Sequence, residues 1–246
     1  MEKLVQGAKK LGIMLDAKQV KQFVLYYKEL IAWNKRINLT RIIDYAEAQV
    51  RHFLDSLTIT LALSQEEMKK PDFNLIDLGT GAGFPGVPLK IALSEPRLVL
   101  IDSNIKKTAF LRHVVQKLEL DNVEIIHGRA EEIGHQERYR EQFDLVVSRA
   151  VASLPILLEL ALPFCRIGGK FVAQKKGEFN QELQKANKAI NILGGKLNEV
   201  KNVGLEEFGD ERCLVIFAKI SPTPEKYPRR PGMPERRPIQ EVRDVA

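Results

Sequence analysis

The sequence of 246 residues contains only two cysteines, Cys165 and Cys213. Two thiols are too few for a cysteine metal site, and they do not make the framework of a disulfide-rich secreted domain. The N-terminus has no apolar stretch of the kind found in secretory signals. The longest apolar run, 150–165, contains Glu159 and two prolines and is shorter than the roughly 20 residues that cross a bilayer. We therefore expect a cytoplasmic protein with no metal site and no membrane segment.

The chain also lacks a strong excess of charge, since 38 basic and 32 acidic residues give a net charge of +6. The excess is confined to the flanks: the net charge is +4 over residues 1–70, zero over 71–220 and +2 over 221–246. A neutral middle with basic ends suggests a binding or catalytic core whose attachments hold a polyanion. A net charge of +6 also serves solubility alone at this size, so charge leaves both interpretations open.

Hydrophobic periodicity divides the chain into helices followed by alternating strands and helices. Apolar residues spaced as on one helix face predict helices over 18–33 and 44–63. Strands that alternate with helices form a mostly parallel sheet through right-handed crossovers. The last two strands have no helix between them, so we expect a hairpin and one reversed strand in a seven-stranded sheet. Strands are predicted at 73–78, 97–102, 123–127, 143–148, 169–175, 196–203 and 211–219, and further helices at 86–94, 104–118, 153–163 and 178–193.

These patterns predict three parts of unequal size. Residues 1–70 form a small N-terminal helical addition, and residues 71–220 form a Rossmann-like α/β domain. Residues 221–246 differ in composition, because six of the twelve prolines lie between 221 and 238 with five basic residues among them. Proline at this density excludes a helix or a central strand. We therefore expect a basic, Pro/Arg-rich C-terminal arm that is either extended or a disordered linker.

The strongest local motif is IDLGTGAGFPG, residues 76–86, where a strand ends in Asp77 and enters a glycine-rich turn. Glycines allow positive φ and a close approach of the backbone to a ligand. Three of these glycines fit G-x-G-x-x-G, and Asp102 ends the next strand, where it can accept hydrogen bonds from ribose hydroxyls. An NAD-dependent oxidoreductase is therefore one candidate. Asp77, however, suits a cationic cofactor better than a pyrophosphate, which favours S-adenosylmethionine.

The chain resembles the seven-strand S-adenosylmethionine-dependent methyltransferases, and in particular the glucose-inhibited division protein B family. That family methylates N7 of a guanine in bacterial small-subunit (16S) ribosomal RNA. The glycine motif followed by SRAVA is far more specific than the glycines alone. The resemblance covers essentially the whole chain. It rests on NKRINLT (34–40), RHFLDSL (51–57), DLGTGAGFPGVPLK (77–90), IDSNIKKTAFL (101–111), GRAEE (128–132), VSRAVA (147–152) and YPRRPGMP (227–234).

The resemblance implies a class I methyltransferase fold, S-adenosylmethionine as cofactor, and small-subunit ribosomal RNA or a small-subunit particle as partner. It implies that Phe84 packs near the methionyl-adenosyl part of the cofactor, that Asp102 holds the ribose, and that the backbone of Ala130 or Glu131 binds the adenine. Arg149, at the end of the fourth strand, lines the site. The full set of expected cofactor-binding residues is Gly79, Gly81, Phe84, Asp102, Ala130, Glu131 and Arg149.

No catalytic acid, base or nucleophile is expected for this reaction. N7 of guanine carries an in-plane lone pair and is unprotonated at neutral pH, so the enzyme has only to align the reacting atoms and exclude water. A cytosine-C5 methyltransferase needs a thiolate, whereas both cysteines fall in predicted core elements. An adenine-N6 enzyme normally has an Asn/Asp-Pro-Pro-aromatic run after the fourth strand, where this chain has Ser148-Arg149-Ala150.

Several further residues have candidate roles in RNA binding. His52 and Asp55 can hydrogen-bond across one helical turn, and we expect a structural or RNA-positioning role for them. Tyr227 is expected either to stack on an unpaired base or to pack the C-terminal segment on the core. The remaining candidates are basic residues that either follow an RNA backbone or form an ordinary solvated surface: Lys106, Lys107, Arg112, Lys175 and Lys176.

Two alternatives from other classes stay open beside the methyltransferase: an NAD-dependent oxidoreductase and a catalytically silent, RNA-binding ribosome-assembly factor. The intact Asp77–Gly83 loop and Asp102 argue against the silent factor. If the basic flanks hold RNA, removal of residues 222–246 should weaken RNA binding and leave cofactor affinity nearly unchanged. Equal loss of both would mean that the C-terminal segment is part of the folded core.

Overall fold

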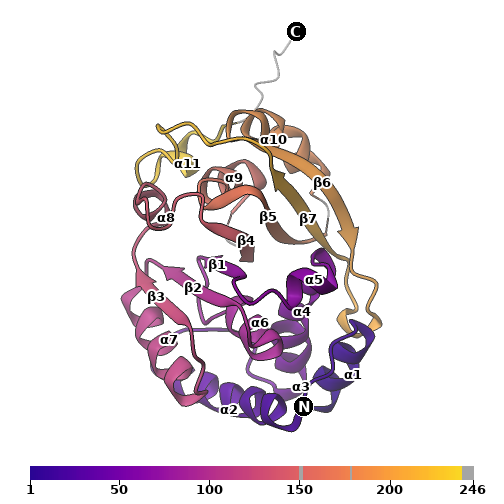
Figure 1. The fold of residues 1–246 in the computed structure, drawn as a ribbon. Coiled ribbons are helices and arrows are strands. Elements are labelled where there is room, and N and C mark those ends of the chain that lie inside the picture. Colours follow the sequence, from indigo (N-terminus) through magenta and orange to yellow (C-terminus); the bar gives the residue numbers. More distant parts are fainter. Residues whose placement is uncertain (150–151, 178, 240–246) are drawn as a thin grey trace.

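Seven strands form a single mixed sheet in the order β3-β2-β1-β4-β5-β7-β6 (Figure 1). The structure, a computed structural model, describes residues 1–149, 152–177 and 179–239. The β1–β2, β1–β4, β2–β3 and β4–β5 pairs are parallel, and β7 runs antiparallel to both β5 and β6. The predicted seven-stranded sheet with one reversed strand is confirmed. The strands are β1 (Asn74–Leu78), β2 (Arg97–Asp102), β3 (Val123–His127), β4 (Phe143–Arg149), β5 (Cys165–Lys176), β6 (Gly195–Asn202) and β7 (Arg212–Lys219).

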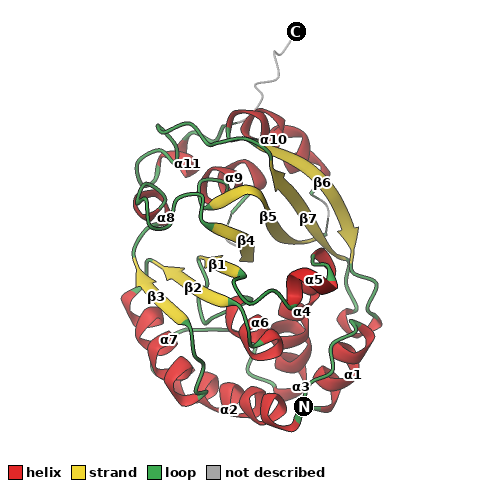
Figure 2. Cartoon of the chain, viewed as in Figure 1, coloured by secondary structure: helices red, strands yellow, loops and turns green. Residues whose placement is uncertain are grey.

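Helices cover both faces of this sheet (Figure 2). Five helices follow the predicted ranges within a few residues, namely α2, α6, α7, α9 and α10. The helices α1, α5, α8 and α11 were not predicted. In the part of the chain that the structure describes, no helix has both the length and the apolar character needed to cross a membrane. The helices are α1 (Glu2–Lys10), α2 (Ala17–Asn34), α3 (Tyr45–Ala48), α4 (Asp55–Leu57), α5 (Gln65–Met68), α6 (Gly86–Leu93), α7 (Ile105–Lys117), α8 (Ala130–Ile133), α9 (Leu154–Ala161), α10 (Asn180–Ile192) and α11 (Met233–Arg236).

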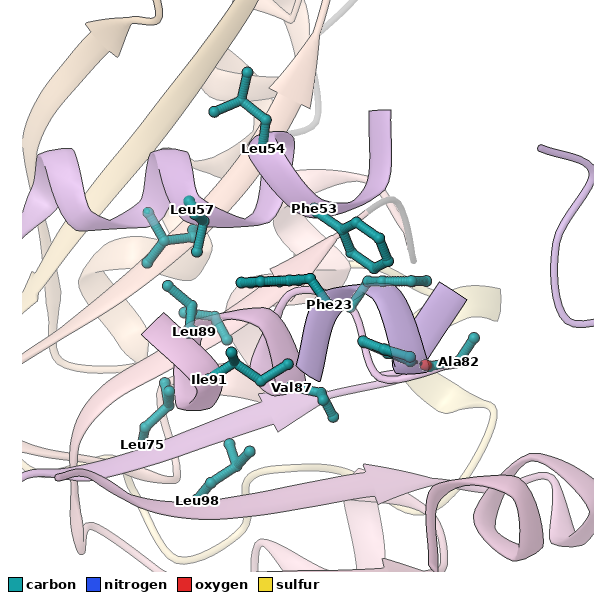
Figure 3. Close-up of a cluster of buried hydrophobic side chains, with 14 of the residues drawn as sticks. Phe23, Phe53, Leu54, Leu57, Leu75, Ala82, Val87, Leu89, Ile91 and Leu98 are labelled. Atoms are coloured by element: carbon teal, nitrogen blue, oxygen red, sulfur yellow. Dashed lines mark hydrogen bonds between the residues drawn. The ribbon is translucent and has the colours of Figure 1, made fainter. Parts of the chain in front are cut away.

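The N-terminal helices share one hydrophobic core with the sheet. Phe23 of α2 and Phe53 are fully buried and belong to the same cluster as Val87 of α6 (Figure 3). Leu75 of β1 and Leu98 of β2 point into this cluster from the sheet. Their neighbours along each strand face the other side, where α9 and α10 pack, because successive strand residues point to opposite faces. Residues 1–70 therefore belong to the helical layer on one face of the sheet, to which α6 and α7 also contribute.

The second N-terminal helix is interrupted, although the sequence predicts one continuous helix over 44–63. Between α3 and α4 lies a π-helix, η1 (Gln49–Leu54), and α4 passes into a 3₁₀-helix, η2 (Thr58–Ala62). π-helical turns are rare and frequently occur at functional sites. Here the π-turn contains His52 and is followed directly by Asp55, both of which are buried. The interruption thus falls at the two polar residues whose role the sequence left open.

Residues 221–239 pack on the domain and contain the short helix α11, whereas an extended or disordered arm without a helix was expected. Pro234 lies in the first turn of α11, where a missing N–H breaks no helical hydrogen bond. Thr223 and Tyr227 are buried. The Arg140 guanidinium donates to the carbonyl oxygens of both residues, at 2.8 Å each. Proline has no N–H donor, so a proline-rich segment pairs few of its carbonyl groups within a helix or sheet, and its buried carbonyls need donors from elsewhere. Arg140 supplies those donors, and this holds the segment on the surface of the sheet domain. Residues 240–246 of the expected arm lie outside the described residues.

Candidate functional site

A glycine-rich turn connects β1 to α6 at the carboxyl edge of the sheet. Gly79, Gly81 and Gly83 have φ angles of 65°, 61° and 98°, values that residues with a Cβ atom rarely adopt. At Gly83 a Cβ atom would lie 2.5 Å from the hydroxyl oxygen of Tyr26. The Tyr26 hydroxyl donates to the carbonyl oxygen of Ala82 in the same turn. The helix α2 therefore holds the turn in shape.

Asp77 lies beneath this turn and is fully buried. Its Oδ2 accepts from the Thr80 hydroxyl at 2.6 Å and from the Gly86 amide at 2.8 Å. Its Oδ1 has no partner among the described residues. Burial raises the pKa of the carboxyl to about 6, although these hydrogen bonds and the Arg149 charge act in the opposite direction. At neutral pH the site thus contains a poorly compensated negative charge, which favours a cationic ligand.

Asp102, at the end of β2, faces the same turn. Its Oδ2 accepts from the Gly81 amide and its Oδ1 from the Asn104 amide, both at 2.8 Å. A carboxylate oxygen has two lone pairs, so each oxygen can accept one more hydrogen bond from a ligand hydroxyl. The two amides fix the orientation of the carboxylate in advance, which suits the ribose-binding role expected for Asp102.

A pocket, which we call the adenosine pocket after the role that the sequence resemblance implies for its residues, opens beside Asp102. Four of the seven expected cofactor residues line it together: Gly79, Asp102, Ala130 and Glu131. Glu235, which the sequence did not suggest as a site residue, completes the wall from the C-terminal segment.

Phe84 contacts both His52 and Arg149 in a second pocket, which we call the transfer pocket. The Phe84 and His52 rings are stacked with centroids 4.5 Å apart, and the guanidinium carbon of Arg149 lies 4.9 Å from the Phe84 centroid. Burial, with the charge of Arg149, lowers the pKa of His52 to about 3, so the imidazole is neutral at physiological pH. The transfer pocket is also lined by Gly79, Gly81 and Asp102. All seven expected residues thus line one pocket or the other.

Asp55 joins two arginines at the border of the transfer pocket. Its Oδ2 accepts from Arg149 Nη1 at 3.1 Å, and its Oδ1 accepts from Arg212 Nη1 at 2.5 Å. The Asp55 side chain is only 7% exposed, and the two arginine side chains are 17% and 12% exposed. Ion pairs shielded from water in this way interact more strongly than surface pairs. Asp55 therefore fixes both guanidinium groups at the mouth of the site.

A third opening, the basic cleft, adjoins the transfer pocket and shares His52 and Arg149 with it. Gln174 of β5 lies in this cleft. Its Nε2 donates to the Asp55 carbonyl oxygen at 2.6 Å and to the Thr58 hydroxyl at 3.1 Å, while its Oε1 has no partner among the described residues. The cleft is also lined by the basic residues Arg51, Lys175, Lys176 and Arg212.

The sequence did not identify Gln174 or Arg212 as site residues. One feature of the sequence could have marked Gln174 as a site residue. It lies near the carboxyl end of a predicted parallel strand, where ligands of α/β sheets usually bind. Arg212 begins the reversed strand β7, and its approach to Asp55 spans 157 positions along the chain. No local pattern indicates such a contact.

The basic residues expected to contact RNA fall into two groups. Lys175 and Lys176 line the basic cleft, and Lys107 lines the transfer pocket. Lys106 and Arg112 are exposed on α7 and line none of the three openings.

Tyr227 packs the C-terminal segment on the core, the second of its two expected roles. Its ring is part of the hydrophobic cluster on the α9 and α10 face of the sheet, and the residue is only 8% exposed. A ring in that position has no free face on which a base could stack, so the first expected role is not supported.

Both cysteines are poor nucleophiles in this structure. Burial raises the pKa of Cys165 to about 12 and that of Cys213 to about 11, so neither forms a thiolate at neutral pH. No group of metal-ligating side chains occurs among the described residues. The chemistry that the described site can support is therefore binding, alignment and charge compensation.

Known proteins match nearly the whole chain. Residues 19–212 match a family model described as rRNA small subunit methyltransferase G. The chain is 44% identical over 237 residues to the ribosomal RNA small subunit methyltransferase G of Alkaliphilus metalliredigens, which covers 96% of this chain and 98% of that protein. It is 46% identical over 238 residues to the protein of the same name from Pelotomaculum thermopropionicum, with 97% and 98% covered.

Solved structures share the fold at much lower identity. A SAM-dependent methyltransferase from Aquifex aeolicus superposes with a TM-score of 0.52 at 16% identity, covering 72% of this chain and 94% of that chain. Fibrillarin from Aeropyrum pernix, solved with natively bound S-adenosyl-L-methionine, gives a TM-score of 0.50 at 17% identity, covering 67% and 73%. The resemblance at this distance concerns the fold alone, and it agrees with the predicted class I methyltransferase architecture.

Proposed function

The chain belongs to the rRNA small subunit methyltransferase G family of S-adenosylmethionine-dependent methyltransferases, and from this we propose that it methylates N7 of a guanine in small-subunit (16S) ribosomal RNA. The observation that carries the proposal is the continuity of the three openings. The adenosine and transfer pockets share Gly79 and Asp102, and the transfer pocket and basic cleft share His52 and Arg149. A small-molecule site thus leads directly to a cleft lined by several basic side chains, each of which also pairs with a carboxylate.

The residues present suit S-adenosylmethionine. Asp102 offers two pre-oriented acceptors for the ribose hydroxyls, and Ala130 and Glu131 line the space available for the adenine. Asp77, with one unpartnered oxygen, supplies negative charge below the turn. When bound, the cofactor supplies an electrophilic methyl group on a positively charged sulfur. A negative charge behind the turn favours a cationic ligand over the anionic pyrophosphate of NAD, and this supports S-adenosylmethionine.

The protein's part in the reaction is alignment and exclusion of water. Guanine N7 needs no base, because its lone pair is free at neutral pH, and His52, whose pKa is lowered to about 3, is too weak a base to act as one. Phe84 and His52 form a stacked, largely buried wall of the transfer pocket, which limits the entry of water. Asp77 would hold a negative charge beneath the turn, which would favour the cationic forms of both the cofactor and the methylated guanine.

The basic cleft is the proposed RNA-binding surface. Arg149 and Arg212 are candidates to hold a phosphate or guanine O6, because one guanidinium group can donate two parallel hydrogen bonds to such acceptors. Lys175 and Lys176 would contribute phosphate contacts, which add affinity without sequence choice. Small-subunit rRNA or a small-subunit particle is the proposed partner, and the cytoplasm the proposed compartment.

Transfer of a labelled methyl group tests the proposal. Purified protein is incubated with tritiated S-adenosylmethionine and small subunits from cells that lack this protein, and the nucleosides are separated after digestion. We expect label in 7-methylguanosine and its loss in Asp102→Asn. Label in another nucleoside, or none from a protein shown to bind S-adenosylhomocysteine, would overturn the assignment. Stabilisation by NAD but not by S-adenosylhomocysteine in a thermal shift would instead favour the oxidoreductase.

A further inference from the structure

The C-terminal segment 223–237 lies where it can act on the cofactor. Glu235 of α11 lines the adenosine pocket together with Glu131 of α8 and with Leu157 and Ala161 of α9. The helices α8, α9 and α11 lie together at one end of the molecule (Figure 1), and α11 contacts α9. The wall of the pocket therefore contains a piece of chain more than a hundred positions beyond β3.

A buried ion pair fixes this segment to α9. Glu159 is completely buried, and its Oε1 accepts from both the backbone amide and the Nε of Arg229, each at 2.8 Å, while Oε2 accepts from Arg229 Nη2 at 2.6 Å. The same Nη2 donates to the Arg237 carbonyl oxygen at 2.7 Å. Arg229 thus links α9 to both ends of the turn that contains α11. Neither Glu159 nor Arg229 lines the adenosine pocket.

Further contacts connect the C-terminal segment to α8 and to the residues that follow it, beside the pocket. The Gly232 amide donates to Glu131 Oε1 at 3.1 Å, so the segment orients a carboxylate that lines the adenosine pocket. The His135 ring donates from Nε2 to the Pro228 carbonyl oxygen at 2.7 Å. At Gly134 a Cβ atom would meet the Pro228 ring at 3.1 Å. The loop after β3 and the C-terminal segment therefore form one packed wall.

We propose that segment 223–237 is a clasp that completes the adenosine pocket, with Glu159 and Arg229 as its positioning residues and Glu131 and Glu235 as the groups that face the adenosine half of the cofactor. The proposal rests on the cofactor role of that pocket. Two carboxylates at this end suit donors of the nucleoside, its ribose hydroxyls and its exocyclic amine. The segment thus has a role in cofactor binding, whereas its basic composition suggested only a role in RNA binding.

Calorimetric binding of S-adenosylhomocysteine and of 5′-methylthioadenosine tests the clasp. The second ligand has the adenosine end but no amino-acid part. Arg229→Gln should lower the binding affinity for both ligands by the same factor of roughly ten. A hydrogen bond to a charged group contributes enough free energy to account for such a change. Arg229→Lys keeps the charge but not the forked geometry, and it should give a smaller loss. Arg230→Gln is the matched control, since Arg230 is exposed one position further on.

Steady-state kinetics separates the clasp from a general structural role. Arg229→Gln should raise KM for S-adenosylmethionine by a similar factor while kcat at saturation is kept. Glu235→Gln alters an exposed side chain and so keeps the fold. It should lower the affinity for 5′-methylthioadenosine roughly threefold, which is the effect expected from the loss of one modest hydrogen bond. All variants are compared at a temperature well below their unfolding midpoints, so that loss of fold is not counted as loss of affinity.

Two results would overturn the clasp. One is unchanged affinity for both ligands in Arg229→Gln and Glu235→Gln. The other is a loss for S-adenosylhomocysteine that 5′-methylthioadenosine does not share, because the defect would then lie at the amino-acid end. Failure of the wild-type protein to bind either ligand would instead contradict the cofactor site itself, so the two failures are distinguishable.

Discussion

Replacing Asp77 with asparagine should stabilise the ligand-free protein at neutral pH. The carboxyl is fully buried, and burial raises its pKa from 3.8 to about 6. Because the pKa of Asp77 is higher in the folded than in the unfolded protein, the ionised carboxylate destabilises the folded state at neutral pH, by about 3 kcal/mol. Asparagine keeps an oxygen for the Thr80 and Gly86 donors and removes the charge. The variant should therefore unfold at higher urea concentration than the wild type.

The effect has a defined dependence on pH. Below about pH 4 Asp77 is protonated in both the folded and the unfolded wild type, so the two proteins should have similar free energies of unfolding. Between about pH 4 and pH 6 the unfolded chain releases this proton first, and wild-type stability falls relative to the variant as pH rises. Above that window the difference should level off near 3 kcal/mol. Urea unfolding at closely spaced pH values measures the difference directly.

Asp144 provides a control of opposite sign. Hydrogen bonds from the Asn74 amide, Lys70 and Arg166 lower its pKa despite partial burial. The stability it contributes is present above its unfolded pKa and is lost as pH falls, so Asp144→Asn should destabilise the protein at neutral pH and less so in acid. A pH-independent difference for Asp77→Asn, or a less stable Asp77→Asn at neutral pH, would refute the reasoning. The variant should also lose more affinity for cationic S-adenosylmethionine than for neutral S-adenosylhomocysteine.

Three further predictions concern the mouth of the site. Asp55→Asn should lower the free energy of urea unfolding by about 3 kcal/mol, because it leaves two largely buried arginines without their shared partner; an unchanged unfolding midpoint would contradict this. Lys175→Gln combined with Lys176→Gln should reduce the slope of log affinity for rRNA against log salt by about 2 while S-adenosylhomocysteine affinity is kept; an unchanged slope would remove both lysines from the RNA surface. Gln174→Met should lower kcat/KM for rRNA roughly tenfold with KM for the cofactor unchanged, since it removes an unpartnered acceptor from the cleft; equal activity would show that the Gln174 amide does not contact the substrate.

Local sequence patterns were sufficient for the sheet and for the glycine turn with the two aspartates beside it. Periodicity gives the strands because each buries a short apolar run, and the absence of a helix between the last two strands requires the reversed strand β7. Asp77, the glycine turn and Asp102 could be found because parallel strands present their carboxyl ends at one edge. These residues lie close together along the chain or at equivalent ends of neighbouring strands, so their proximity follows from the fold class alone.

The C-terminal segment shows where composition misleads. Prolines and arginines at 221–238 suggest an extended arm, and removal of residues 222–246 was expected to leave cofactor affinity nearly unchanged. In the structure Arg229 pairs with the buried Glu159 and Gly232 contacts Glu131. We now expect the same truncation to weaken cofactor binding. The partner of a charged side chain cannot be read from its neighbours in sequence, and Glu159 lies 70 positions away.

The sequence by itself determined the sheet, its reversed strand, the family and the glycine turn with Asp77 and Asp102 beside it, because these depend on periodicity and on local motifs. Only the tertiary structure decided which charges meet. Asp55 holds Arg149 and Arg212 from positions 94 and 157 residues away, and Glu159 holds Arg229. The energy of a buried charge depends on the distance to its partner and on the exclusion of water from both. Both quantities arise only when distant segments pack together.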